Sequence, residues 1–124
     1  MEWLWRTHGE RVESVVLFGS RARGDALDAS DYDLFLVLRA EDGLRFTDRI
    51  GLYQDVLTGK VDVFPYCPSD IAAMEQDSSG FLLEVLADGR PLQDRGAWAR
   101  LQERFQRRLA NGQVERVAGG WKLR

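Results

Sequence analysis

The sequence has little of the residue types that make disulfides and thiolate metal sites. Cys67 is the only cysteine among 124 residues, and His8 is the only histidine. A single thiol excludes an internal disulfide, and it also excludes a zinc site built from clustered thiolates. The composition therefore favours a reducing compartment, and we expect a cytoplasmic protein.

Long apolar stretches are missing as well. The longest unbroken apolar runs are residues 15–18 and 34–38, far shorter than the roughly 20 residues of a membrane-spanning helix. The first residues carry an acid early and no long apolar segment, so no signal peptide or membrane association is expected. With 44% hydrophobic and 30% charged residues, the chain has the profile of one compact globular domain.

The net charge of −3 hides an asymmetry. Residues 1–94 carry nine Lys/Arg and eighteen Asp/Glu, whereas residues 95–124 carry eight Lys/Arg and two Asp/Glu. We expect residues 1–94 to form the core, and residues 95–124 to form a basic C-terminal helix and tail of the same domain. Such a segment either docks on the acidic body or faces an acidic partner.

Hydrophobic periodicity predicts a small α+β fold. Strands are expected at residues 15–18, 31–38 and 60–64, with an edge strand at 90–92. Helices are expected at residues 2–11, 42–58, 69–77, 80–88 and 96–110. We expect a small, mixed, twisted sheet with helices packed mainly on one side and carboxylates at its open edge. The tail through Trp121 is expected to be loosely ordered.

Three aspartates, Asp31, Asp33 and Asp62, fall in or beside predicted strands, where aspartate is depleted. Such a break in an otherwise consistent strand indicates a functional site. Because strand side chains alternate, Asp31 and Asp33 project from one face, roughly 7 Å apart. If strand 60–64 neighbours strand 31–38, Asp62 approaches the same point. Carboxylates this close repel one another, and a divalent cation such as Mg²⁺ or Mn²⁺ removes the repulsion.

The turn after the first predicted strand offers a binding group for an anion. Gly19 lets the backbone approach a phosphate closely, and Ser20 supplies a hydroxyl. Arg21 and Arg23 add positive charge, although pairing with neighbouring aspartates is an open alternative. No Gly-Lys-Ser/Thr follows, which excludes a P-loop. The turn and the aspartates together predict a site that holds a triphosphate and a metal for in-line attack at phosphorus.

The spacing of these features resembles the DNA polymerase β-like nucleotidyltransferase superfamily. Gly19-Ser20 is followed after ten residues by Asp31-Tyr32-Asp33, and the lone Asp62 comes in a later strand. Residues 17–25 and 30–34 resemble the smallest branch of the superfamily, the minimal nucleotidyltransferases (MNT). Residues 81–92 are similar to the usual ending of that branch.

The resemblance implies a role for each candidate residue. Asp31 and Asp33 would ligate two Mg²⁺ or Mn²⁺ ions, and Asp62 would ligate the catalytic ion and could accept the proton of the attacking hydroxyl. The β- and γ-phosphates of an NTP would bind Ser20 and the backbone of Gly19. The nucleotide-binding candidates are Gly19, Ser20, Arg21 and Arg23.

The reaction that the resemblance implies is transfer of a nucleoside monophosphate, AMP by preference, from an NTP to a hydroxyl. MNT proteins are commonly antitoxins that adenylylate a tyrosine of a HEPN-type toxin, which makes such a toxin the expected partner. A domain this small has little surface for a bulky acceptor, and a homo-oligomer is a further option. Three alternatives stay open: neutralisation of the partner by contact alone, transfer to a small hydroxylated molecule, and RNA-directed transfer. Neither a membrane nor a nucleic acid is the expected partner.

Other residues have simpler interpretations. His8 is expected at the surface, and Cys67 is expected to be a small buried hydrophobe. The apolar face of helix 96–110 is expected to pack in the core or on a partner, and its arginine face to be solvated. The apolar face comprises Trp98, Leu101, Phe105 and Leu109.

Overall fold

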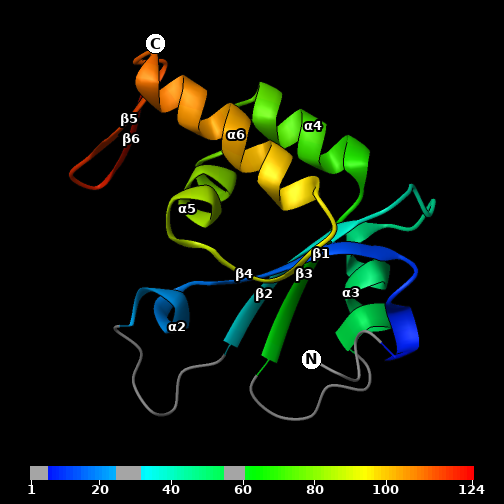
Figure 1. Ribbon diagram of the computed structural model, residues 1–124. Coiled ribbons are helices and arrows are strands. Elements are labelled where there is room, and N and C mark those ends of the chain that lie inside the picture. Colours follow the sequence, from blue (N-terminus) through cyan, green and yellow to red (C-terminus); the bar gives the residue numbers. More distant parts are fainter. Residues whose placement is uncertain (1–5, 25–31, 55–60) are drawn as a thin grey trace.

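The computed structural model describes residues 6–24, 32–54 and 61–124, and a four-stranded mixed sheet forms its centre (Figure 1). The strands are β1 (Val12–Phe18), β2 (Tyr32–Leu38), β3 (Val61–Tyr66) and β4 (Arg90–Asp94). Their order in the sheet is β3-β2-β1-β4. β1 runs antiparallel to β2 and β4, whereas β2 and β3 are parallel. The expected mixed α+β architecture is confirmed.

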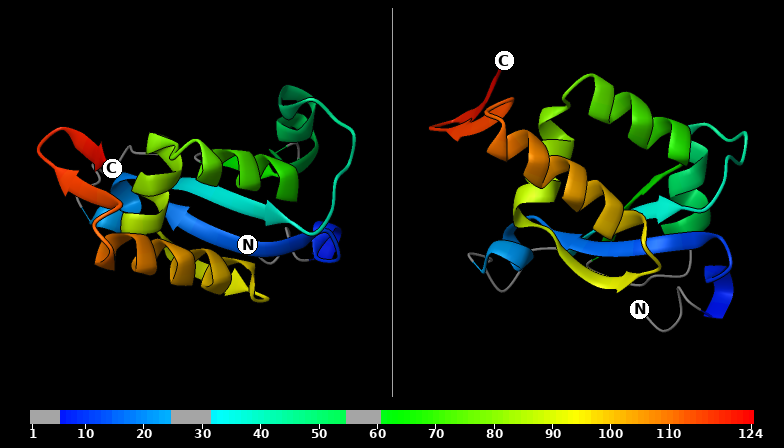
Figure 2. Two further views of the ribbon diagram at one scale, coloured as in Figure 1. Left: turned by 90° about the horizontal axis from the view of Figure 1, so that it is seen from above. Right: turned by 45° about the horizontal axis from the view of Figure 1, so that its top comes forward.

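Helices cover the two faces of the sheet unequally (Figures 1 and 2). They are α2 (Ser20–Arg23), α3 (Phe46–Gln54), α4 (Pro68–Gln76), α5 (Gly80–Asp88) and α6 (Ala97–Ala110). α4, α5 and α6 pack on one face, which we call the three-helix face, and α3 packs on the other. The helices therefore lie mainly on one side, as expected.

The central strand β2 is buried on both faces because its side chains alternate between two cores. Phe35 and Val37 pack under the three-helix face with residues such as Leu101. Leu34 and Leu36, with Leu38, pack on the opposite face with Tyr53 of α3. This double burial explains the unbroken apolar run in the sequence.

β1 begins at Val12, three residues before the expected strand. The sequence did not predict this start because a buried serine interrupts the apolar pattern. Ser14 is fully buried, and its hydroxyl donates to Asp94 Oδ1 at 2.8 Å and accepts from the Trp98 amide at 3.1 Å. Asp94 also accepts from the Trp98 amide at 3.1 Å. These bonds join β1 and β4 to the first turn of α6.

α3 begins at Phe46, four residues after the start of the expected helix 42–58, and residues 55–58 lie outside the described part. The segment before Phe46 is not helical because it turns around a buried guanidinium. Arg49, only 5% exposed, donates to both carboxylate oxygens of Asp42 at 2.8 and 2.9 Å. It also donates to Asp70 at 3.1 Å and to the Pro65 carbonyl at 3.3 Å. This cluster joins the start of α3 to the end of β3 and the start of α4.

The C-terminal tail is ordered, and the expectation of loose order is wrong. β5 (Val114–Val117) and β6 (Gly120–Leu123) form an antiparallel hairpin. Arg116 donates to Asp88 at 2.9 and 3.1 Å and to Glu84 at 2.7 Å. The Trp121 indole donates to Glu84 at 3.1 Å, and its ring packs edge-on against Phe105. Gly119 and Gly120, both with positive φ, lie at the tight turn between the two strands.

Of the remaining expectations, the one for His8 is wrong, and those for Cys67 and the apolar face of α6 are confirmed. His8 is 6% exposed and packs on Tyr53 with ring centroids 4.6 Å apart, so its expected surface position is wrong. Its burial lowers the pKa of the imidazole. Cys67 is 1% exposed, as expected, and the apolar face of α6 packs in the core. Within the described residues, no helix is long and apolar enough to cross a membrane.

Replacing Asp42 by Asn should lower the free energy of unfolding near neutral pH, with a difference that shrinks in acid. Hydrogen bonds from Arg49 lower the pKa of Asp42 to about 2 from an ordinary value of 3.8. Its ionised form therefore stabilises the fold fully above pH 3.8, and this contribution is lost as the pH falls from 3.8 towards about 2. Urea unfolding at a series of pH values measures the difference.

The matched control for this prediction is Asp48→Asn. The Asp48 carboxylate lies 3.7 Å from Arg45, and its side chain is 61% exposed. Its loss should change stability by less than about 1 kcal/mol at any pH. A difference for Asp42→Asn that stays undiminished at the acid end would contradict the assigned linkage.

Candidate active site

Two of the three predicted aspartates lie side by side in the sheet. The register of the parallel strands β2 and β3 makes Asp33 the direct partner of Asp62, on strands about 4.8 Å apart. Both share the three-helix face, because Phe35 and Tyr66, an even number of residues further along each strand, pack there. Both aspartates are half-buried. The expected neighbourhood of the two strands is thus present.

Asp31 lies outside the described residues, so its position relative to this pair stays a prediction from strand alternation. Within the described part of the chain, no three His, Cys, Asp or Glu side chains gather around one point. Of the three predicted aspartates, the structure describes Asp33 and Asp62. Their carboxylate oxygens are hard donors of the kind that Mg²⁺ and Mn²⁺ take as ligands. The residues present therefore fit a divalent cation.

The turn at Gly19 lies directly against one of these acids. β1 ends at Phe18, which is the register partner of Asp33. Gly19 has φ 76° and ψ −159°, a backbone conformation that is essentially restricted to glycine. A Cβ atom at this position would collide with Oδ2 of Asp33. The backbone of the turn and the Asp33 carboxyl group therefore share one small space.

α2 follows this turn at once. The Gly19 carbonyl accepts from the amides of Ala22 and Arg23, each at 3.1 Å. Gly24 ends the helix in a left-handed conformation, and its amide donates to the Ser20 carbonyl at 3.0 Å. Amides at the start of a helix point away from its carbonyls and suit an anion. Ser20 stands at this start and is half-buried.

The two candidate arginines lie in different surroundings. The Arg21 guanidinium stacks over the Tyr32 ring, 4.6 Å from its centroid, a geometry that favours the cation. Arg23 instead lines a cavity beside Gly19. The predicted pairing with neighbouring aspartates concerns residues 25–31, which lie outside the described part.

The cavity beside Gly19 has a volume of about 230 Å³ and lies between the turn and α5. Its walls are Phe18, Gly19, Arg23, Phe81, Glu84, Val85 and Asp88. Hydrogen bonds from Arg116 lower the pKa of Asp88, and the charge of Arg23 lowers it further. The acids of α5 were missed by the sequence analysis. Residues 81–92 were singled out only as similar to the ending of the MNT branch, and nothing local indicates the contact with Arg116, which is 28 residues or more away.

Replacing Gly19 by Ala should displace the Asp33 carboxyl group and cost about 1–3 kcal/mol of stability. Gly24→Ala is the matched control, since Gly24 also has a positive φ of 80° but has no atom within 4 Å of the position that an added methyl group would take. Carboxyl carbon NMR shifts should therefore change at Asp33 in the first variant alone. An unchanged Asp33 shift in Gly19→Ala would contradict the close approach.

Comparisons with known proteins agree on one family. The model of the polymerase beta nucleotidyltransferase family matches residues 5–96. A Sulfolobus solfataricus crystal structure, assigned as a nucleotidyltransferase, is 27% identical with a TM-score of 0.55, over 77% of this chain and 75% of that one. No curated protein is significantly similar in sequence.

Two further structures share the fold at lower identity. A toxin–antitoxin complex with AMP-PNP is 17% identical with a TM-score of 0.56, over 90% of this chain and 86% of that one. The MntA–HepT toxin–antitoxin complex is 16% identical with a TM-score of 0.51, over 90% and 83% of the two chains. The family model covers most of the chain and includes both described aspartates and the turn at Gly19. The chain belongs to the polymerase beta nucleotidyltransferase family.

Proposed function

We propose that the protein transfers a nucleoside monophosphate, AMP by preference, from an NTP to a hydroxyl group of a partner protein. The acceptor is a tyrosine of a HEPN-type toxin, and the protein is its antitoxin in the cytoplasm. One observation carries the chemical part of this proposal: Asp33 and Asp62 are register partners on one face, with the Gly19 turn against Asp33. The toxin–antitoxin neighbours support the biological part.

The Gly19 turn and the start of α2 bind the triphosphate in this proposal. Backbone amides at a helix start favour phosphate oxygens, and the Ser20 hydroxyl adds a donor. Gly19 is required because a side chain there would enter the space of the Asp33 carboxyl group. Arg23 faces the adjoining cavity and is a candidate further contact, whereas Arg21 is held by Tyr32.

Asp33 and Asp62, with Asp31, would hold two Mg²⁺ or Mn²⁺ ions. Such ions neutralise charge on the phosphates and on the attacking and leaving oxygens. Asp62 accepts the proton of the acceptor hydroxyl, whose oxygen forms a bond to the α-phosphorus. The bond from the α-phosphorus to the oxygen that bridges to the β-phosphorus breaks, and pyrophosphate leaves. The products are the nucleotidylated hydroxyl, pyrophosphate and a proton.

The test is incubation of the protein with ATP, Mg²⁺ and the HEPN-type protein encoded beside it. Intact-mass spectrometry should show a gain of AMP units on that partner. Asp33→Asn and Asp62→Asn should each lower the rate at least about 100-fold, because each removes a carboxylate ligand from the reacting centre. Asp48→Asn removes a carboxylate on the surface of α3 and should leave the rate unchanged. Absence of any mass gain with the unaltered protein, for each of the four NTPs, would contradict the proposed reaction.

A second measurement separates catalysis from neutralisation by contact. Growth of cells that carry the partner toxin should be restored by the unaltered protein and by Asp48→Asn. Asp33→Asn should fail to restore it although the altered protein still binds the toxin in a pull-down. Full restoration by Asp33→Asn would favour neutralisation by contact alone.

A further inference from the structure

The three-helix face carries a groove that the proposed reaction does not use. α4 and α6 run side by side in the same direction (Figure 2), joined by the Arg104–Glu75 pair at 2.9 Å and by the Arg108 to Ser78 hydrogen bond at 2.6 Å. A cavity of about 310 Å³ lies between their first turns. A second hollow of about 530 Å³ continues along the helices and shares Arg104 and Glu75 with it. We call the two together the α4–α6 groove.

The floor of the groove near the first turns is apolar. Val37, Ile71 and Leu101 reach it from the core, and each is at most 5% exposed. Ala72 of α4 and Ala97 of α6 also line the cavity, and their methyl groups are more exposed than the floor residues. A cavity between two helices with apolar residues in its lining suits apolar side chains of a second polypeptide.

The rim of the groove is basic. It carries five arginines and two glutamates: Arg39, Arg100, Arg104, Arg107 and Arg108, with Glu13 and Glu75. Both glutamates are already paired, Glu13 with Arg39 at 3.1 Å and Glu75 with Arg104. Arg100 has no acidic partner within the described ranges 6–24, 32–54 and 61–124. In a chain of net charge −3, this rim is a local excess of positive charge.

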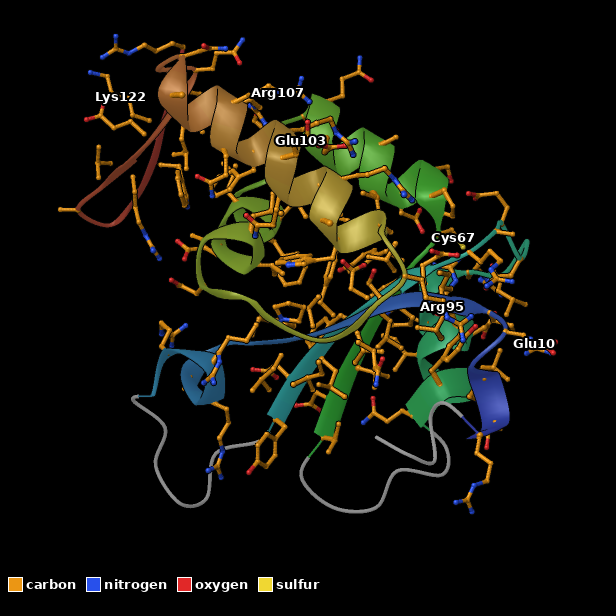
Figure 3. The ribbon with its side chains drawn as sticks, viewed as in Figure 1. Glu10, Cys67, Arg95, Glu103, Arg107 and Lys122 are labelled. Carbon is orange, nitrogen blue, oxygen red and sulfur yellow. The ribbon has the colours of Figure 1, made fainter. Side chains whose placement is uncertain are left out.

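The outer side of α6 extends this charge. Arg107 projects from the helix beside Glu103 (Figure 3), and their charged groups lie 3.8 Å apart with both side chains mostly exposed. A pair this exposed contributes little to stability and is easily exchanged for another partner. Arg107 is therefore available to a carboxylate of a bound molecule.

The first cavity of the groove and the candidate active site lie at opposite ends of β2. Asp33 is near the start of the strand, and Leu38 at its end lines the groove. Leu38 is five residues further along the strand than Asp33, a distance of roughly 17 Å. A segment bound in the groove would thus leave the Gly19 turn and the aspartates open to a nucleotide and an acceptor.

We infer that the α4–α6 groove is the docking surface for an acidic amphipathic helix of the partner protein. The apolar stripe of such a helix would cover the floor, and its carboxylates would meet Arg100 and Arg107. A nucleic acid would bring phosphates to the arginines but would leave the apolar floor unmatched. The inference rests on the proposed function, because it specifies how the protein holds its acceptor.

The test uses synthetic peptides of roughly five helical turns and measures their binding by fluorescence anisotropy. A peptide with a leucine stripe flanked by glutamates should bind saturably, and more weakly at high salt. Three probes should bind at least about tenfold more weakly: the same stripe flanked by lysines, the glutamate peptide with serines in place of leucines, and a single-stranded RNA. Equal binding of the serine peptide or of the RNA would overturn the inference.

Two variants locate the binding to the groove. Arg100→Glu should weaken binding of the glutamate peptide at least about tenfold, whereas Arg45→Glu should leave this binding unchanged. Arg45 is a matched control because its side chain is 90% exposed and lines neither cavity of the groove. Ala72→Trp should block the floor without reversing a charge, and circular dichroism verifies that each variant is folded. Equal weakening by Arg45→Glu, or full binding by Ala72→Trp, would overturn the location.

The result of the peptide-binding test does not depend on the proposed nucleotidyl transfer. Peptide binding requires neither ATP nor a metal, so Asp33→Asn should bind the peptide as the unaltered protein does. Arg100→Glu should lower AMP transfer to the HEPN-type protein by raising the KM for that protein, with an unchanged KM for ATP. Peptide binding without any AMP transfer would contradict the proposed function alone. AMP transfer without specific peptide binding would contradict the docking surface alone.

Discussion

The candidate site depends on the register of β2 between its two neighbours. This register places Asp33 beside Phe18 on one side and beside Asp62 on the other. A slip of one residue would turn Asp33 to the opposite face and would bring the apolar side chains of β2 out of both cores. Burial of β2 on its two faces therefore fixes the position of the acids. The same alternation of side chains along β2 therefore places both its core residues and the aspartate of the candidate site.

Two polar clusters secure the end of the sheet that lies away from the aspartates. Arg49 binds Asp42 and Asp70, which ties α3 to the start of α4. Asp94 accepts hydrogen bonds from Ser14 and from the first turn of α6. Because each cluster fixes the start of a helix, the two together set the spacing of α4 and α6. The α4–α6 groove is thus a consequence of buried polar contacts rather than of loose packing.

Sequence reasoning succeeded where a signal is local. The apolar run that follows Asp33 predicted the strand β2, and helical spacing predicted the buried stripe of α6. It failed where a contact joins distant positions, as between Ser14 and Asp94 or between Arg116 and Glu84. Nothing near a lone serine or arginine indicates a partner that only the fold brings close. The tail was misjudged for this reason, since its order depends on α5. The roles of the site residues stay predictions.

The charge asymmetry of the sequence left two options, docking on the acidic body or exposure to an acidic partner, and the structure divides the basic segment between them. Arg116 binds Glu84 and Asp88 of α5, and Arg104 binds Glu75 of α4. These contacts hold the hairpin and α6 on the body. Arg100 lies on the same helix as Arg104, but within the described residues no acid meets it. The basic segment is thus only partly taken up by contacts with the acidic body, and four of its arginines, Arg100, Arg104, Arg107 and Arg108, line the α4–α6 groove.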